Sequence, residues 1–295
     1  MMVKLLFLLL CPLVLSAQNA GKSNLILFSL QKKADSLWQP ERPIFLSAFN
    51  KGGYSNQPSF FGSYELWVTA QFKNDTTQTD LIALDLLSKN YTRITATPQT
   101  AEYSPTLMPG GKRFSAVRVE ADGNQRLWSF PLDRSDNGRV EFPRIYNVGY
   151  HCWLRDTLVA LFIVGDTQEP HTLQIVGKTA QKQQRIASNI GRCLVAKPDG
   201  KLLFVQKPTE QTWYLKTWDP RSNLQEIVVK MPDGTEDFVL LPDGIYLAAN
   251  GAKLYQFNPR RSQDWKLCAD FSKYGIRKIT RLAVSKDLKL VMVVE

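Results

Sequence analysis

Two short segments of this sequence approach known functional motifs without completing them. Gly53-Tyr54-Ser55-Asn56 begins like the G-x-S-x-G turn that presents a nucleophilic serine, but it lacks the final glycine. Gly21-Lys22-Ser23 matches the end of a phosphate-binding loop, but Ser16 stands where that loop requires its first glycine. The sequence therefore gives no reason to expect a serine hydrolase or a nucleotide site, and we assign no catalytic residue.

Residues that bind metal ions are scarce in this chain. Only two histidines are present, His151 and His171, so three histidine ligands cannot be gathered, and no Cys-x-x-Cys pair occurs. Asp122-Gly123-Asn124 and Asp199-Gly200 carry oxygen atoms that suit calcium, but hairpin turns have this composition without any ion. We therefore expect no metal ion and no other cofactor.

The repeat that must position any functional residue is visible in the turns. Its turn positions fall at residues 62, 111, 157, 200, 244 and 288, at intervals of 43 to 49 residues. The clearest copies are Met108-Pro109-Gly110-Gly111-Lys112, Lys197-Pro198-Asp199-Gly200-Lys201 and Leu241-Pro242-Asp243-Gly244. In such a turn proline fixes φ and glycine takes the left-handed conformation, which is typical of a β-hairpin.

An apolar run follows each turn and has the length and composition of a buried strand. These runs are Glu65–Phe72, Arg113–Val119, Leu158–Val164, Leu202–Gln206, Ile245–Ala249 and Leu290–Val294. A third strand, marked by Leu81, Leu127, Leu173, Leu215 and Leu254, and a short fourth strand complete each unit. Four antiparallel strands in 40–50 residues predict one blade of a β-propeller.

The two ends of the chain complement each other. The last unit stops at Glu295 after its second strand, whereas Asn24–Leu30 and Asp35–Trp38 have the pattern of a third and a fourth strand. We therefore predict an all-β fold with six four-stranded blades in one domain, residues 18–295. The sixth blade is expected to combine residues of about 281–295 with residues 24–40, which closes the ring.

The repeat resembles the WD40-like (PD40) repeat of TolB-type propellers, in which Ser-Pro-Asp-Gly-Lys precedes an apolar strand. Tyr103–Phe114 and Lys197–Phe204 carry this resemblance, and Leu127-Trp128-Ser129-Phe130 is similar to the third strand of the family. It implies a six-bladed propeller, and the family includes periplasmic scaffolds and propellers attached to hydrolases. Only Ser104-Pro105 has the Ser-Pro step in place, and no segment resembles the separate N-terminal domain of TolB.

Propellers bind partners mainly at one face of the disc, around the mouth of the channel. The loops that enter the innermost strands line such a face, and loops on a rigid scaffold commonly carry function. Counting back from each turn places these residues there: Tyr54, Tyr103, Tyr150, His151, Arg192, Glu236 and Arg281. Tyrosine and arginine are enriched at protein interface hot spots, so we predict a binding face.

An enzymatic alternative remains open at this stage, because carboxylates can be paired in space without being paired in sequence. Glu236-Asp237 is the only adjacent acidic pair near the channel mouth, and we interpret it as a solvated loop. The alternative is a propeller hydrolase or lyase that acts on a carbohydrate. Buried carboxylates with a raised pKa at the channel mouth would favour it.

The N-terminus has the pattern of a secretory signal peptide. A basic start at Lys4 precedes the apolar run Leu5–Leu15 and the small residues Ser16 and Ala17. The apolar run is too short for a membrane-spanning helix, which needs roughly 20 residues. We therefore predict a cleaved leader, residues 1–17, no transmembrane segment, and a periplasmic or secreted protein.

Cys152, Cys193 and Cys268 remain after this cleavage, an odd number that leaves at least one thiol outside an intramolecular disulfide. Cys152 and Cys193 lie near the starts of successive repeats, so both a disulfide between neighbouring blades and two buried thiols are open, and we favour the thiols.

The net side-chain charge falls only from +10 to +9 when the leader is removed. The basic residues are scattered without a run of five, which argues against a nucleic-acid-binding tail. We therefore predict a monomeric, non-catalytic protein of the bacterial envelope that binds a protein or peptide partner and no nucleic acid.

Overall fold

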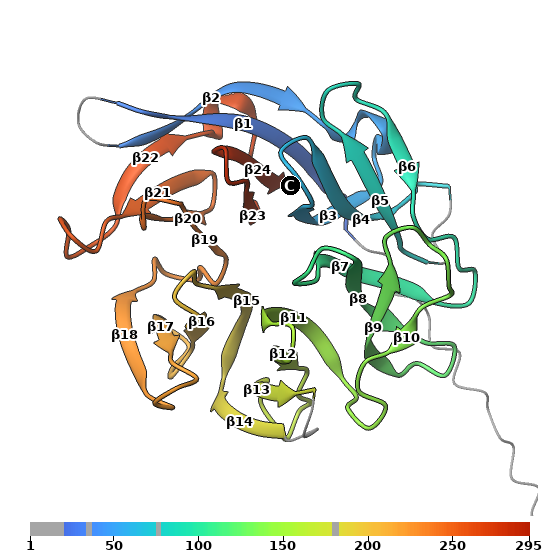
Figure 1. Ribbon diagram of the computed structural model, residues 1–295. Helices are drawn as coiled ribbons and strands as arrows, with labels where there is room; N and C mark the ends of the chain where they lie inside the picture. Colours follow the sequence, from blue (N-terminus) through green and yellow to red (C-terminus); the bar gives the residue numbers. More distant parts are fainter. Residues whose placement is uncertain (1–20, 34–36, 75–77, 179–182) are drawn as a thin grey trace, which may run out of the picture.

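The computed structural model describes residues 21–33, 37–74, 78–178 and 183–295. Within these residues, 24 strands form six four-stranded antiparallel sheets that are arranged in a ring (Figure 1). Two short 3-10 helices, η1 (Ser47–Asn50) and η2 (Ser272–Tyr274), connect strands. The prediction of an all-β, six-bladed propeller is confirmed. The predicted leader, residues 1–17, lies outside the described part of the chain.

Five blades are built from consecutive strands. The first is β3 (Tyr54–Phe60), β4 (Glu65–Gln71), β5 (Asp80–Asp85) and β6 (Tyr91–Arg93). The second is β7 (Ala101–Leu107), β8 (Arg113–Val119), β9 (Gln125–Pro131) and β10 (Arg139–Val140). The third is β11 (Val148–Arg155), β12 (Leu158–Ile163), β13 (Thr172–Gly177) and β14 (Gln183–Ser188).

The fourth blade is β15 (Ile190–Ala196), β16 (Leu202–Gln206), β17 (Tyr214–Trp218) and β18 (Gln225–Lys230). The fifth is β19 (Phe238–Leu240), β20 (Tyr246–Asn250), β21 (Lys253–Phe257) and β22 (Lys266–Asp270). In each of these blades the first strand lies next to the central channel and the last lies at the rim (Figure 1).

The sixth blade joins the two ends of the described chain. It pairs β23 (Ile279–Val284) and β24 (Lys289–Val294) with β1 (Asn24–Lys32) and β2 (Trp38–Phe45). The register between β1 and β24 runs from Asn24 opposite Val294 to Ser29 opposite Lys289. The composite blade is confirmed, although β2 extends to Phe45, beyond the predicted limit near residue 40.

The apolar core is divided among the blade interfaces, because six clusters of buried side chains each join two neighbouring blades. Strand β24 shows how its sequence achieves this. Leu290, Met292 and Val294 pack toward the fifth blade, whereas Val291 and Val293 pack toward the first. Successive side chains of a strand point to opposite faces, so a strand with neighbours on both sides is apolar throughout.

The predicted turns position these strands. Gly200 and Gly244 adopt φ values of +85°, the left-handed conformation that the Pro-Asp-Gly pattern predicts. In the sixth blade Leu288 takes the corresponding position with a φ of 64°, and the Ser285 hydroxyl accepts a hydrogen bond from the Lys289 amide. No helix in the described ranges is long and apolar enough to cross a bilayer.

Candidate functional site

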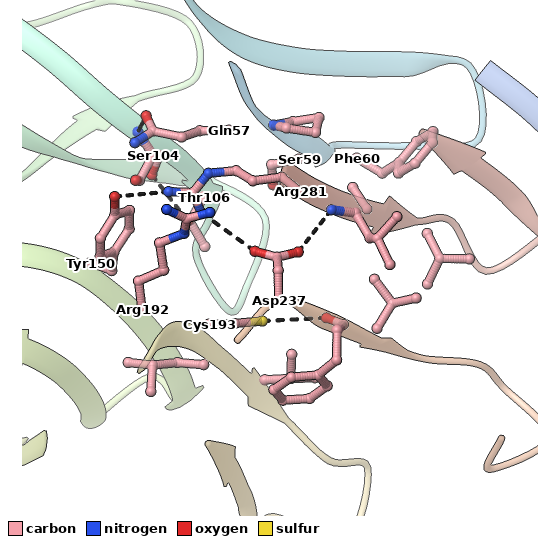
Figure 2. Close-up of a pocket in the computed structure, with 18 of the residues that line it drawn as sticks. Gln57, Ser59, Phe60, Ser104, Thr106, Tyr150, Arg192, Cys193, Asp237 and Arg281 are labelled. Carbon is pink, nitrogen blue, oxygen red and sulfur yellow. Dashed lines mark hydrogen bonds and ion pairs between the residues drawn. The ribbon is translucent and has the colours of Figure 1, made fainter. Parts of the chain in front are cut away.

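A cavity of about 400 Å³ lies where the innermost strands of the blades converge. Residues of β3, β7, β11, β15, β19 and β23 line it, so every blade contributes to its wall. Figure 2 shows Tyr150, Arg192, Asp237 and Arg281 around this space. A rigid ring of strands therefore holds side chains from distant parts of the sequence around one cavity.

Arg281 is the central cation of this cavity. Its guanidinium lies 4.8 Å from the centre of the Tyr150 ring, and its Nη2 atom donates a 2.8 Å hydrogen bond to the Tyr150 hydroxyl. Its Nη1 atom lies 3.8 Å from Oδ2 of Asp237. That distance is too long for a hydrogen bond. The Arg281 side chain is only 12% exposed, so this charge is held in a site largely shielded from water.

Asp237 lies opposite Arg281 (Figure 2). Its Oδ1 atom accepts a 2.8 Å hydrogen bond from the Leu282 amide, which fixes the carboxyl against β23. Burial raises the pKa of Asp237 above its usual value, and the nearby Arg281 and Arg192 charges offset this only in part. The carboxyl therefore gains less from its arginine neighbours than it loses by leaving water.

Arg192 belongs to a second charged group at the same mouth. Its Nη2 atom donates a 2.8 Å hydrogen bond to the Thr280 carbonyl, and its Nε atom lies 3.5 Å from Oε1 of Glu236. Lys207 pairs with the other oxygen of Glu236. Burial acts to raise the pKa of Glu236, but the Lys207 hydrogen bond and the Arg192 charge outweigh it and lower this pKa.

Tyr54 and Tyr103 lie beside this group. Burial raises the pKa of the Tyr54 hydroxyl to about 12, and Arg281, Tyr150, Tyr103 and Arg192 all act on it electrostatically. The structure thus brings Tyr54, Tyr103, Tyr150, Arg192 and Arg281 into one electrostatic neighbourhood. The Tyr54 hydroxyl therefore stays protonated at neutral pH and can donate a hydrogen bond.

His151 points away from this group toward the second blade. Its Nε2 atom lies 2.7 Å from the Ser115 hydroxyl, which also accepts a 2.9 Å hydrogen bond from Trp153 Nε1. The direction of the Ser115–His151 hydrogen bond depends on the His151 tautomer, since the Ser115 hydroxyl can also donate to the Thr106 carbonyl at 3.4 Å. Burial lowers the pKa of His151 to about 3, so the ring stays neutral. Because Ser115 is fully buried, this Ser–His pair cannot reach a substrate and instead joins two blades.

The interpretation of Glu236-Asp237 as a solvated loop is wrong. The two side chains are 21% and 13% exposed, and both take part in ion pairs. Sequence analysis also missed Lys207, Gln57 and Ser104. The Gln57 side chain accepts a 2.8 Å hydrogen bond from the Ser104 amide and so joins the first two blades at the cavity wall. Gln57-Pro58 and Ser104-Pro105 share one dipeptide pattern, which is the signal that could have indicated them.

The cysteines that the structure describes are free thiols, as we favoured over a disulfide. Burial raises the pKa of Cys152 to about 12, and it raises that of Cys193 well above the usual value. Both thiols therefore stay protonated and unreactive. Within the described ranges, no three His, Cys, Asp or Glu side chains are grouped so that they could hold a metal ion.

The arrangement is suited to binding an anion. Three cations, Arg192, Lys207 and Arg281, face the two carboxyls of Glu236 and Asp237, and tyrosine hydroxyls surround them. Arginine offers five N–H donors in a planar fork that matches a carboxylate. The site can therefore hold and orient a negatively charged group inside a shaped cavity.

Neither a known family profile nor a curated protein sequence matches this chain. Solved structures do match it. It aligns with the putative TolB from Agrobacterium tumefaciens at a TM-score of 0.64 and 10% identity, covering 93% of this chain and 98% of that one. It aligns with TolB from Acinetobacter baumannii at a TM-score of 0.56 and 12% identity, covering 92% of this chain but only 64% of that one.

Propeller enzymes are also similar in structure. An oligogalacturonate lyase in complex with manganese aligns at a TM-score of 0.53 and 12% identity, covering 93% of this chain and 97% of that one. One fold hosts many functions, so identities this low establish the architecture alone. On this basis, the chain is a six-bladed β-propeller similar to the TolB-type propellers.

Proposed function

We propose that this protein is an exported binding protein that takes up a segment of a protein or peptide partner at the mouth of its propeller channel. One observation carries the proposal: Arg281 and Tyr150, from the sixth and third blades, meet over an open cavity. Their contact fixes both side chains before any partner arrives. Binding then costs less ordering entropy than it would with mobile side chains.

The composition of the cavity favours a protein segment as the occupant. Tyr150, Arg192 and Arg281 belong to its polar wall, and tyrosine and arginine are enriched among interface hot spots. Phe60, Leu194 and Phe238 add apolar surface beside them. A volume near 400 Å³ is in the range of small-ligand sites, so it suits a few residues of a chain rather than a folded domain.

The location and the oligomeric state are part of the same proposal. The pattern of residues 1–17 supports export to the periplasm or beyond, and the scattered basic residues support a partner other than nucleic acid. We propose a monomer, since the ring closes its own sheets through the composite blade.

Capture from the cell envelope of the source organism tests this function. Residues 18–295 are immobilised as the native sequence and as an Arg192→Gln/Arg281→Gln double variant. The matched control is Arg139→Gln/Arg221→Gln, which removes the same charge from rim residues that are 67% and 70% exposed. We expect one partner to be retained by the native protein and the control and lost by the channel variant. Equal retention by all three would place binding elsewhere.

A second candidate function has its own observation. Glu236 and Asp237 lie at the same mouth, and their surroundings shift the two pKa values in opposite directions. Such a pair can divide acid and base roles, and we propose a carbohydrate lyase or hydrolase as the alternative. The similarity to an oligogalacturonate lyase suggests the substrate to try first.

Incubation with oligogalacturonate separates the two functions. An enzyme would release shortened or unsaturated products, and an Asp237→Asn variant would abolish this turnover while keeping its fold. The binding function predicts no turnover by either form. Product formation that depends on Asp237 would overturn the proposed role as a non-catalytic binder.

A further inference from the structure

We infer that the partner segment presents a carboxylate to the channel, and that Arg281 and Arg192 receive it. This inference rests on the proposed function and gives it a chemical class of ligand. The group that enters is either an aspartate or glutamate side chain or the free carboxyl end of a chain. Both carry the same planar anion.

The first argument is the unused donor capacity of Arg281. A guanidinium has five N–H groups. Across the described residues, Arg281 makes one hydrogen bond, to Tyr150, and its ion pair with Asp237 is open at 3.8 Å. A buried arginine that donates so little leaves N–H groups directed at the cavity, where an incoming carboxylate can accept two of them.

Arg192 supports the same conclusion from the fourth blade. Its Nε atom is buried and has no hydrogen-bond partner among the residues described, although Glu236 lies 3.5 Å away. An unmade hydrogen bond at a buried charged donor is costly, so such groups normally have a partner. A small rotation of this side chain toward a bound anion would supply one.

The charge of the site is the second argument. Arg192 and Arg281 carry two positive charges on the cavity wall against the carboxyl of Asp237, which leaves an excess of one. Electrostatic attraction is stronger in a shielded cavity than in bulk water. A single carboxylate restores neutrality, whereas a cationic ligand would increase the imbalance.

The backbone around the cavity favours a peptide as the ligand that carries the carboxylate, rather than a non-peptide carboxylate. The strands β3, β7, β11, β15, β19 and β23 each end the strand order of their sheet on the channel side, so one edge of each is unpaired. Such edges offer N–H and C=O groups to an extended chain. Irregularities in the register between Asn56 and Ser59 and between Tyr103 and Thr106 interrupt two of these strands at the wall.

Ser104 adds a polar group to this wall. Its backbone has a φ of 55°, and its hydroxyl is buried without a hydrogen-bond partner in the described part of the chain. Positive φ values at residues other than glycine are strained, and such positions cluster at binding sites. A peptide that enters the cavity could pair with this hydroxyl.

The test uses four synthetic dodecapeptide pools and immobilised residues 18–295. The pools combine a free or an amidated C-terminus with the presence or absence of aspartate and glutamate. Retained peptides are quantified by mass spectrometry. We expect the amidated pool without acidic residues to be retained at least about tenfold less than the best pool, because it lacks a charge-assisted hydrogen bond to arginine. Which of the other pools is retained identifies the source of the carboxylate.

Two variants make the result specific to the channel. Arg192→Gln/Arg281→Gln should lower retention of the carboxylate pools to the level of the neutral pool, while Arg139→Gln/Arg221→Gln should leave it unchanged. Asp237→Asn should instead increase retention, because it removes the competing anion and keeps an oxygen that can accept from the Leu282 amide. Misfolding would raise retention of all four pools, so a gain confined to the carboxylate pools distinguishes the two effects.

The outcomes separate this inference from the proposed function. If all pools are retained equally and this retention is lost in the arginine double variant, carboxylate recognition is rejected and peptide binding stands. If oligogalacturonate is retained but no peptide pool is, peptide binding is rejected and this inference with it. No change in Asp237→Asn would contradict the role of Arg281 as the receiving group.

Discussion

Two buried arginine–carboxylate pairs in this protein differ in how completely they are satisfied. At the interface of the first two blades, Arg118 Nε donates a 2.8 Å hydrogen bond to Glu102, and the hydroxyls of Thr97 and Thr100 also donate to that carboxylate. At the channel, Arg281 and Asp237 are 3.8 Å apart. Arg118 and Arg281 are equally shielded, at 12% exposure each.

The difference shows that burial alone does not separate structural from functional charges. Arg118 lies over the neighbouring rings of Trp128 and Phe130, and its Nε atom donates to Glu102, so protein groups already contact this guanidinium. Arg281 lies over one ring and faces a cavity. The saturated pair joins β7 to β8 within the second blade, whereas an unsaturated pair beside a cavity keeps capacity for a ligand.

Removing Glu102 should have the largest effect on stability. Glu102→Ala leaves the Arg118 charge and two threonine hydroxyls, all partly buried, without their acceptor. We expect a loss of about 3–5 kcal/mol in the free energy of unfolding, measured by urea denaturation. A loss below about 1 kcal/mol would remove the distinction between the two pairs.

Removing Arg281 should lower stability less than removing Glu102 does, but it should abolish peptide binding. Arg281→Gln leaves Asp237 buried, but this carboxyl already has a raised pKa and can take up a proton. We expect a loss of about 2 kcal/mol in the same denaturation experiment and no retention of the carboxylate peptide pools. A loss as large as that of Glu102→Ala would assign Arg281 a structural role.

Removing one donor from the saturated pair should have a modest effect. Thr97→Val keeps the shape of the side chain but removes the hydroxyl that contacts both Glu102 oxygens at 2.8 and 3.0 Å. We expect a loss of about 1 kcal/mol because Arg118 and Thr100 still donate. Peptide retention should stay at the native level, and any decrease would link this interface to the channel.

The dependence of stability on pH should be the smallest difference. Since the pKa of folded Asp237 lies above 3.8, its folded form binds a proton more tightly than the unfolded chain does. The free energy of unfolding contributed by this group therefore falls as pH rises from 3.8 through the folded pKa, and it stays low at neutral pH. Asp237→Asn should remove this loss.

The measurement is denaturation of the native protein and Asp237→Asn across that range. We expect the stability advantage of the variant to grow as pH rises from 3.8 through the pKa of folded Asp237 and to stay constant above that pKa. The matched control is Asn56→Asp, which introduces a new carboxyl at a buried position of β3. This variant should become less stable relative to the native protein as pH rises. A difference that is constant with pH would show that Asp237 does not titrate as described.

The fold was predictable because its signals are local and repeated. Pro198-Asp199-Gly200 and Pro242-Asp243-Gly244 determine hairpins through φ alone, and the apolar run Leu290–Val294 reports neighbours on both faces. Counting back from these turns selected Tyr150, His151, Arg192 and Arg281, which line the cavity, since equal repeats bring equal positions to the channel. It also selected Tyr54 and Tyr103, which do not line it.

The pairing of side chains at the site was not predictable in the same way. Tyr150 and His151 were assigned to one face, but adjacent strand residues point to opposite sides, so His151 contacts Ser115 of the second blade instead. Irregularities in β15 and β23 set the directions of Arg192 and Arg281. Such irregularities depend on neighbouring blades, which the local sequence does not specify.

The composite blade has a consequence for how the protein is made. Asn24 and Val294 are neighbours in the finished sheet, so β1 pairs only with β2, and its other edge stays open, until β24 has been synthesised and delivered. If the chain is exported, its first hairpin must wait on the far side of the membrane with apolar side chains such as Leu25 and Phe28 uncovered. Strand pairing over such a sequence distance is slow, because the entropy cost of loop closure comes before the contacts that offset it. We therefore expect chaperones and proteases to compete for this waiting hairpin.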